Sequence, residues 1–307
     1  MKSSRLCCFC LFNAVTLTGA LGQRFPDRFV TINPLADQRH GTTGGINWMH
    51  SSGGWGEFGA YRVVRDQEHA WVQRLGAFIE MFRIDNDASL AFIGNIEFIA
   101  NPHNNIRFNP RSIFWEEGFF FTGRSAEHYW QVGYFHRCKH DIDNFLLGKE
   151  RSLIFGSLQA KYLIPFTADG GLTEGLFVLR TDVFTIRQDD REPQVSQDLD
   201  LNRAIGSAMM LAHFRQQFNQ SILGLYLTGW GGLSLYSGRD GIFNRFGSVE
   251  SAAFNGGFSG GVAVHGNAHF RIGLSYEYLS DTGVDPVPGH AHLLSVGVTI
   301  VNPASMW

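Results

Sequence analysis

Hydrophobic and polar residues alternate along most of the chain after about residue 57. The segment 269–279 shows the pattern most clearly: its apolar positions are Phe270, Ile272, Leu274, Tyr276 and Tyr278, and the positions between them are Arg271, Gly273, Ser275 and Glu277. Successive side chains of a β-strand point to opposite sides, so this segment is predicted to be a strand with one apolar and one polar face.

Twelve such segments can be counted, which predicts an all-β fold of about twelve strands. Their approximate spans are 57–65, 71–84, 89–99, 111–122, 127–138, 151–164, 173–187, 201–216, 221–237, 251–264, 269–279 and 292–301. Connections after even-numbered segments are short, and most connections after odd-numbered segments are longer and more polar. Outer-membrane barrels have short periplasmic turns and longer outer loops. The sequence therefore predicts a single antiparallel transmembrane β-barrel with both barrel ends on the periplasmic side.

Composition agrees with a surface that does not face water. Charged residues are 17% of the chain, against about a quarter in soluble proteins, and no run approaches the roughly 20 apolar residues of a membrane helix. A soluble sandwich or a lipocalin-like barrel would also alternate. Three features favour the membrane barrel: glycine and charged residues on the polar faces, Tyr and Trp toward strand ends, and the terminal Trp307, which resembles the sorting signal of bacterial outer-membrane proteins.

The beginning of the chain is typical of a secretory signal peptide. Lys2 and Arg5 form a basic start, residues 6–17 form a short apolar core, and residues 20–22 place small side chains where a signal peptidase cleaves. We expect cleavage before Gln23 and export to the outer membrane of a Gram-negative bacterium.

After removal of the signal peptide, residues 1–22, we expect a periplasmic leader over 23–55, outside the barrel, and the barrel over 56–307. Three of the four cysteines are removed, so Cys138 remains and no internal disulfide is possible. The mature chain has 23 basic and 28 acidic residues, a net charge of −5, which argues against nucleic-acid binding. No nucleotide loop, zinc-protease motif or Gly-x-Ser-x-Gly elbow is present, and no cofactor is expected.

The most unusual stretch lies at the outer end of the fifth segment. It reads His136, Arg137, Cys138, Lys139, His140, Asp141, Ile142, Asp143 and Asn144. Extended geometry places His136 and Cys138 on the lipid-facing side of the strand. A nucleophile beside a base, close to lipid ester groups, is what a lipid hydrolase needs, and a nearby carboxylate would orient the histidine. The candidate catalytic residues are therefore His136, Cys138, His140, Asp141 and Asp143.

This stretch carries two resemblances. A His-x-Ser pair on the outer lipid face of a twelve-strand barrel resembles outer-membrane phospholipase A; here Cys138 stands in the place of the serine, and a surface thiol is prone to oxidation. The stretch also resembles a family of uncharacterised bacterial outer-membrane barrels with a His-x-Ser-Ser-His-x-x-Asp-Glu motif. His136, His140 and Asp143 match that motif, whereas Cys138, Lys139 and Asn144 depart from it. The second resemblance implies a location in the outer membrane and no particular activity.

Two other interpretations of the cluster stay open. It is a polar rim that joins loops by hydrogen bonds, or His136, His140 and Asp143 bind a divalent metal ion. We favour the structural interpretation, so the predicted function is an outer-membrane barrel without a catalytic role, either a scaffold or a narrow pore. The alternative is a lipid-modifying hydrolase. The expected partners are outer-membrane lipid and, as further candidates, small solutes or a divalent ion.

Charged residues of both signs fall on the predicted lumen face. They are Arg74, Glu80, Glu97, Glu116, Arg180, Asp182, Arg271 and Glu277. Buried charges are costly unless they are paired, and a pore selective for one sign of ion would carry a more uniform lining. We therefore expect these side chains to form ion pairs that fill the interior, with a small water-filled channel as the alternative.

Overall fold

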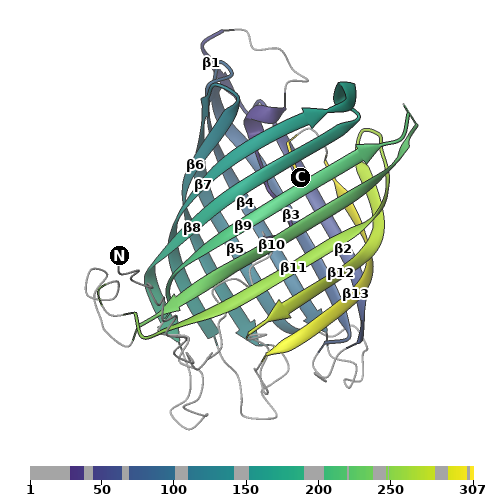
Figure 1. Ribbon diagram of the computed structural model, residues 1–307. Helices are drawn as coiled ribbons and strands as arrows, with labels where there is room; N and C mark the ends of the chain where they lie inside the picture. The colour runs from purple at the N-terminus through teal and green to yellow at the C-terminus, as the bar shows by residue number, and fades with distance from the viewer. Residues whose placement is uncertain are drawn as a thin grey trace, which may run out of the picture.

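The protein forms one closed antiparallel β-barrel (Figure 1). The structure is a computed structural model that describes residues 28–37, 44–63, 69–100, 110–141, 152–189, 204–219, 221–237, 247, 249–280, 290–302 and 305–307. The barrel strands are β2 (Ser52–Val63), β3 (Trp71–Ile84), β4 (Ala88–Ala100), β5 (Pro110–Ser125), β6 (His128–Asp141), β7 (Ser152–Ala168), β8 (Thr173–Asp189), β9 (Ala204–Gln217), β10 (Leu223–Tyr236), β11 (Ser251–Val264), β12 (His269–Leu279) and β13 (Ala291–Val301). The predicted twelve-strand barrel is confirmed.

The barrel closes between its first and last strands. Val301 of β13 pairs with Trp55 near the start of β2, so both strand ends lie at the same end of the barrel. The short strand β1 (Ile46–Trp48) pairs with the end of β3 just beyond β2 and adds a thirteenth strand to the sheet. The first barrel strand therefore begins at Ser52, a few residues before the predicted boundary.

Five short turns gather at the end where β2 begins and β13 finishes, which we call the short-turn mouth (top of Figure 1). Left-handed backbone lets the chain reverse within so few residues. Asp85, with φ 47°, and Asn219, with φ 39°, provide it between β3 and β4 and between β9 and β10. Both side chains tolerate this conformation better than most residues do.

The outward face of the barrel is apolar. Eleven of the twelve barrel strands each expose at least one large apolar side chain; one example from each is Phe58, Leu75, Phe119, Val132, Leu158, Phe177, Met210, Leu227, Phe254, Ile272 and Val298. The inward positions between them hold most of the charged residues, which is the reverse of a water-soluble barrel. Among the described residues, no helix has the length and apolar character to cross a bilayer.

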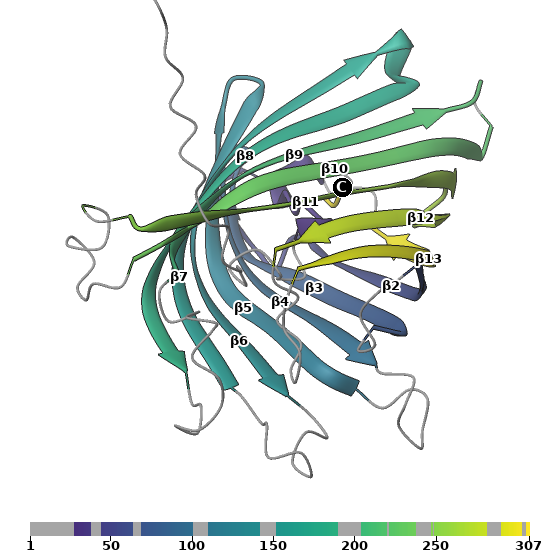
Figure 2. The ribbon, with the colours of Figure 1, turned by 60° about the horizontal axis from the view of Figure 1, so that its bottom comes forward.

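The described part of the leader, residues 28–37, lies inside the barrel (Figures 1 and 2). Hydrogen bonds to several strands hold it, among them Thr31 Oγ1 to His213 Nε2 of β9 (2.9 Å), Gln131 Nε2 of β6 to the Ile32 carbonyl (2.8 Å) and Arg83 Nη1 of β3 to the Asp37 carbonyl (2.7 Å). We expected the leader outside the barrel, and for residues 28–37 this is wrong, because their polar groups find partners on the lumen face. The predicted signal peptide lies outside the described residues.

The C-terminal residues also fold back into the lumen, and Figures 1 and 2 both place the C-terminus within the barrel. The backbone of Thr31 exchanges two hydrogen bonds with Trp307, at 3.2 and 3.0 Å. β13 ends at Val301, so Trp307 is not the last residue of a strand. Its ring instead packs against the Arg215 guanidinium, 3.8 Å from the ring centroid. The terminal aromatic residue thus stabilises the lumen contents and does not belong to the lipid-facing surface.

Candidate functional site

The stretch 136–144, which we call the outer cluster, is divided between the two faces of β6 where the structure describes it. His136 and His140 are exposed on the outward face, and Cys138 lies on the same face but is only 7% exposed. Arg137 and Lys139 are buried on the lumen side. The two basic side chains therefore do not share a face with the Cys138 thiol.

Cys138 is covered by neighbouring strands. Its cross-strand partners are Trp115 on β5 and Ile154 on β7. Among the described residues, no hydrogen bond joins the thiol to His136. A small, covered thiol without a base is typical of a packing residue rather than a nucleophile.

An acidic residue that the sequence analysis did not single out lies beside this cluster. Glu117 on β5 is the cross-strand partner of His136, and its Oε2 accepts a hydrogen bond of 3.2 Å from Trp115 Nε1. The sequence could have indicated this position. Glu117 directly follows Glu116, which was predicted to face the lumen, and alternation along a strand then places Glu117 on the outward face. A carboxylate and an imidazole are thus adjacent on an otherwise apolar surface.

A serine–histidine pair lies nearer the end of the strands. His140 Nδ1 is 2.9 Å from the Oγ of Ser152, the first residue of β7. The sequence analysis did not include Ser152. Asp143 and the side chain of Asp141 lie outside the described part of the chain, so the three-residue metal set and the orienting acid stay predictions. Within the described residues, no group of three or more His, Cys, Asp or Glu is placed to hold a metal ion.

An apolar groove borders the outer cluster. It has a volume of about 620 Å³, and its floor is made largely of small residues, among them Gly54, Gly56, Ala77 and Gly94. Trp115 contributes to its wall and connects it to Glu117 through the indole hydrogen bond. On a lipid-facing surface, a groove of this kind suits a hydrocarbon chain.

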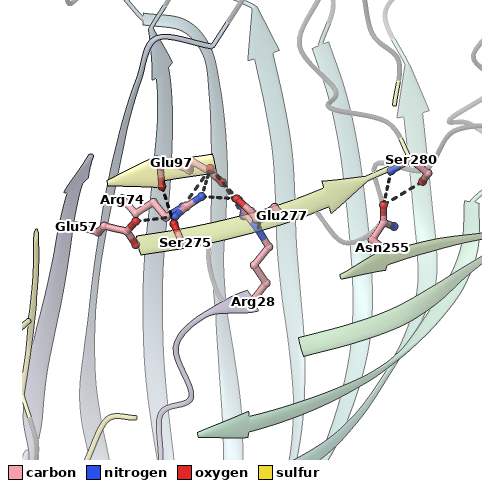
Figure 3. A network of polar contacts seen from close by, with 9 residues as sticks. Arg28, Glu57, Arg74, Glu97, Asn255, Ser275, Glu277 and Ser280 are labelled. Atoms are coloured by element: carbon pink, nitrogen blue, oxygen red, sulfur yellow. Dashed lines mark hydrogen bonds and ion pairs between the residues drawn. The ribbon is translucent and has the colours of Figure 1, made fainter. Parts of the chain in front are cut away.

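The lumen contains a network of ion pairs built around the leader (Figure 3). Arg28 is fully buried, with its Nε 2.5 Å from Glu277 and its Nη1 2.7 Å from Glu97. Arg74 of β3 also contacts Glu277, at 2.8 Å, and pairs with Glu57 at 2.8 Å. Each guanidinium lies between carboxylates, so the network compensates the cost of removing these charges from water.

A second network crosses the neighbouring strands. Arg137 Nε lies 2.5 Å from Glu116, and its Nη1 lies 2.9 Å from Asp182, which also pairs with Arg180 at 2.7 Å. Gln159 donates a further hydrogen bond of 3.0 Å to Asp182. The prediction of paired lumen charges is confirmed for these residues.

A small cavity lies between the leader and the strands. A cavity of about 20 Å³ lies between Phe29, Glu57 and Tyr226, which is room for about one water molecule. The described part of the leader, the C-terminal residues and the ion pairs all lie inside the barrel.

No protein-family model and no curated protein sequence matches this chain. Three similar solved structures are the outer-membrane phospholipase (OMPLA) dimer with bound calcium from Salmonella typhi (TM-score 0.47, 11% identity, 89% of this chain and 98% of that chain), the β domain of the Bordetella autotransporter BrkA (0.44, 8%, 82% and 99%) and LpxR from Salmonella typhimurium (0.43, 7%, 81% and 99%). At these scores the likeness carries no argument about activity, and the assignment of this chain as a twelve-strand β-barrel rests on its strand order and register.

Proposed function

We propose that the protein is an outer-membrane barrel without a catalytic role, acting as a scaffold or as a narrow pore that its own leader closes. The observation that carries this proposal is the position of Arg28, which is fully buried between Glu97 and Glu277 inside the barrel. A plug held by ion pairs depends on its charge, so reversing that charge is the direct test of whether it closes the barrel.

Conductance across planar bilayers separates a scaffold from a gated pore. The wild-type protein is expected to show no stable conductance. Arg28→Glu places a third carboxylate against Glu97 and Glu277, so repulsion is expected to release the leader and produce channel openings. Arg62→Glu changes an exposed side chain and is the matched control. Steady conductance of the wild-type protein contradicts closure, and silence of both proteins favours the scaffold.

The apolar outward face and the five short turns at one end support the proposed location in the outer membrane. The precursor is expected to be cleaved before Gln23 and to fractionate with the outer membrane. The folded barrel is expected to migrate differently in detergent gels before and after heating. Recovery in the soluble periplasmic fraction contradicts this location.

A lipid-modifying hydrolase is the second candidate, and the contact between His140 Nδ1 and Ser152 Oγ favours it. Base and hydroxyl lie on the outward face, and the apolar groove lies close to the neighbouring Glu117. Such an enzyme would act on outer-membrane lipid, with a divalent ion as a candidate requirement.

Fatty-acid release from phosphatidylethanolamine vesicles, with and without calcium, tests this activity. If activity is found, its loss in Ser152→Ala or in Cys138→Ala identifies the nucleophile. Cys138→Ser keeps a hydroxyl that can replace the thiol, so this variant is expected to retain activity. Thr181→Ala, at an exposed outward position of β8, is the control. Absence of fatty-acid release supports the non-catalytic proposal.

A further inference from the structure

One buried arginine differs from all the others in the described part of the chain. Seven arginines are buried, and six have a carboxylate at 2.5–2.8 Å: Arg28, Arg74, Arg83, Arg137, Arg180 and Arg215. Arg271 of β12 is 5% exposed, and no described carboxylate pairs with it. Its Nε atom is buried without a hydrogen-bond partner among the described residues. A buried charge in this state is unfavourable unless something else compensates it.

Aromatic rings orient this arginine and its neighbour. The Arg271 guanidinium lies over the Tyr226 ring, 5.1 Å from the centroid, and Arg215 lies against Trp307. Stacking covers the flat face of a guanidinium and leaves the N–H groups at its edge for a planar acceptor. The carboxylate that pairs with Arg215, Glu174, is 42% exposed, so water screens much of its charge.

A chain of hydrogen bonds runs from Arg215 through His269 to His265. It ends at His265 Nε2, a donor without a partner among the described residues. Arg215 can only donate, so its contact of 3.5 Å with His269 Nδ1 places the proton of a neutral His269 on Nε2. That Nε2 lies 3.2 Å from His265 Nδ1 and donates to it. A neutral His265 then carries its proton on Nε2, which is buried without a partner among the described residues.

The two donors without a partner, Arg271 Nε and His265 Nε2, belong to side chains that lie against the inward face of β10. The His265 ring occupies the space where a side chain at position 224 would stand, and Arg271 covers Tyr226, the next inward residue of that strand. Burial, followed by the positive charges of Arg215 and Arg271, lowers the pKa of His265, which agrees with a region of excess positive charge. His213 and Lys161 face the same region, and Glu174 is the acidic group whose charge acts on His265.

We propose that Arg271, Arg215 and His265 form an oxyanion-binding site at the short-turn mouth, for the carboxylate or phosphate group of a ligand. His265 lies in the turn between β11 and β12, so the site is near the opening of the barrel. Arg271 supplies the uncompensated charge, and His265 Nε2 supplies a neutral donor. The site is separate from the outer cluster, and the proposal does not rest on closure of the barrel by the leader.

Equilibrium dialysis of the purified full-length barrel in detergent tests the site, with inorganic phosphate and acetate as probes and chloride to match ionic strength. We expect about one anion per chain, and at least tenfold weaker binding by Arg271→Gln. Arg124→Gln is the control, because Arg124 is an exposed arginine at the same mouth. Folding of each variant is checked by its heat-modifiable migration.

The two probes separate the ligand classes. Stronger binding of phosphate assigns a phosphoryl group, and stronger binding of acetate assigns a carboxylate. If Arg271→Gln fails to fold, Arg271→Lys is measured in its place. This variant keeps the charge but loses the planar guanidinium, and it is expected to retain only part of the anion binding. Absence of binding of either anion to the wild-type protein, or equal binding by Arg271→Gln, overturns the proposal.

Discussion

Arg28 and Glu277 are 249 positions apart in the sequence, yet the Nε atom of Arg28 lies 2.5 Å from the carboxylate of Glu277 inside the barrel. This contact joins the leader to β12, and Glu97 joins the same guanidinium to β4. The leader therefore depends on the lumen for its position, and the lumen depends on the leader for its charge balance.

Arg28→Ala is expected to lower the free energy of unfolding by about 3–5 kcal/mol, the usual cost of removing one partner from a buried ion pair. Glu97 and Glu277 stay buried with Arg74 as their remaining partner. Urea titration of the barrel in lipid vesicles, followed by tryptophan fluorescence, measures the change. The exposed control Arg62→Ala is expected to change stability by less than about 0.5 kcal/mol. Equal effects of the two substitutions would show that the lumen pair adds no stability.

Gly261 and Gly94 form a matched pair for testing close packing of the strands. A Cβ atom at Gly261 would meet the backbone of Ile272 and Gly273 on β12, whereas one at Gly94 meets nothing within 4 Å. Gly261→Ala is expected to cost about 1–3 kcal/mol, the usual range for overpacking, and Gly94→Ala to leave stability unchanged. Midpoints of urea unfolding compare the two variants, and the prediction fails if Gly94→Ala is the more damaging.

Ala126, in the turn between β5 and β6, has a left-handed backbone with φ 54°. This conformation is unfavourable for a residue with a Cβ atom, so Ala126→Gly is expected to raise stability by about 0.5–1 kcal/mol. Ala160→Gly, inside β7, is expected to lower stability by about the same amount. The two changes should have opposite signs in the same urea experiment, and a loss at both positions would contradict the assignment of strain to Ala126.

His265 is expected to make the barrel less stable in mild acid. Its pKa is lowered in the folded state by burial and then by the charges of Arg215 and Arg271, so the unfolded chain takes up its proton first as pH falls below the ordinary value of about 6.5. The stability that neutral His265 contributes is therefore present above that pH and is lost below it. His265→Gln should flatten the pH dependence between pH 7.5 and 5.5. An unchanged slope would contradict this assignment.

The barrel itself could be predicted because its pattern is local. Alternation at positions such as Phe270 and Ile272 reflects strand geometry alone, and the twelve spans follow from it. One departure is the irregularity of β3 near Glu80 and Phe82, where the register with β4 shifts. A pattern of alternating residues does not show where such a shift falls.

The contents of the lumen could not be predicted in the same way. Residues 23–55 have no regular period, and the partners of Arg28 are set by the closed barrel rather than by neighbouring sequence. The outer cluster was found from its unusual composition, but Glu117 and Ser152 come from other strands and approach it only through cross-strand pairing. Arg271 was predicted to form an ion pair, and only the side-chain positions reveal that it lacks a carboxylate partner among the described residues.

The backbone exchange between Thr31 and Trp307 sets an order of events during folding. The leader is synthesised long before the strand that carries Glu277 and before the residues that follow β13, so its final contacts cannot form until the rest of the chain is in place. Contacts between residues so distant in sequence form slowly, because a long loop must close first. Residues 28–37, although made early, therefore reach their final position late, only once β12 and the residues that follow β13 are available.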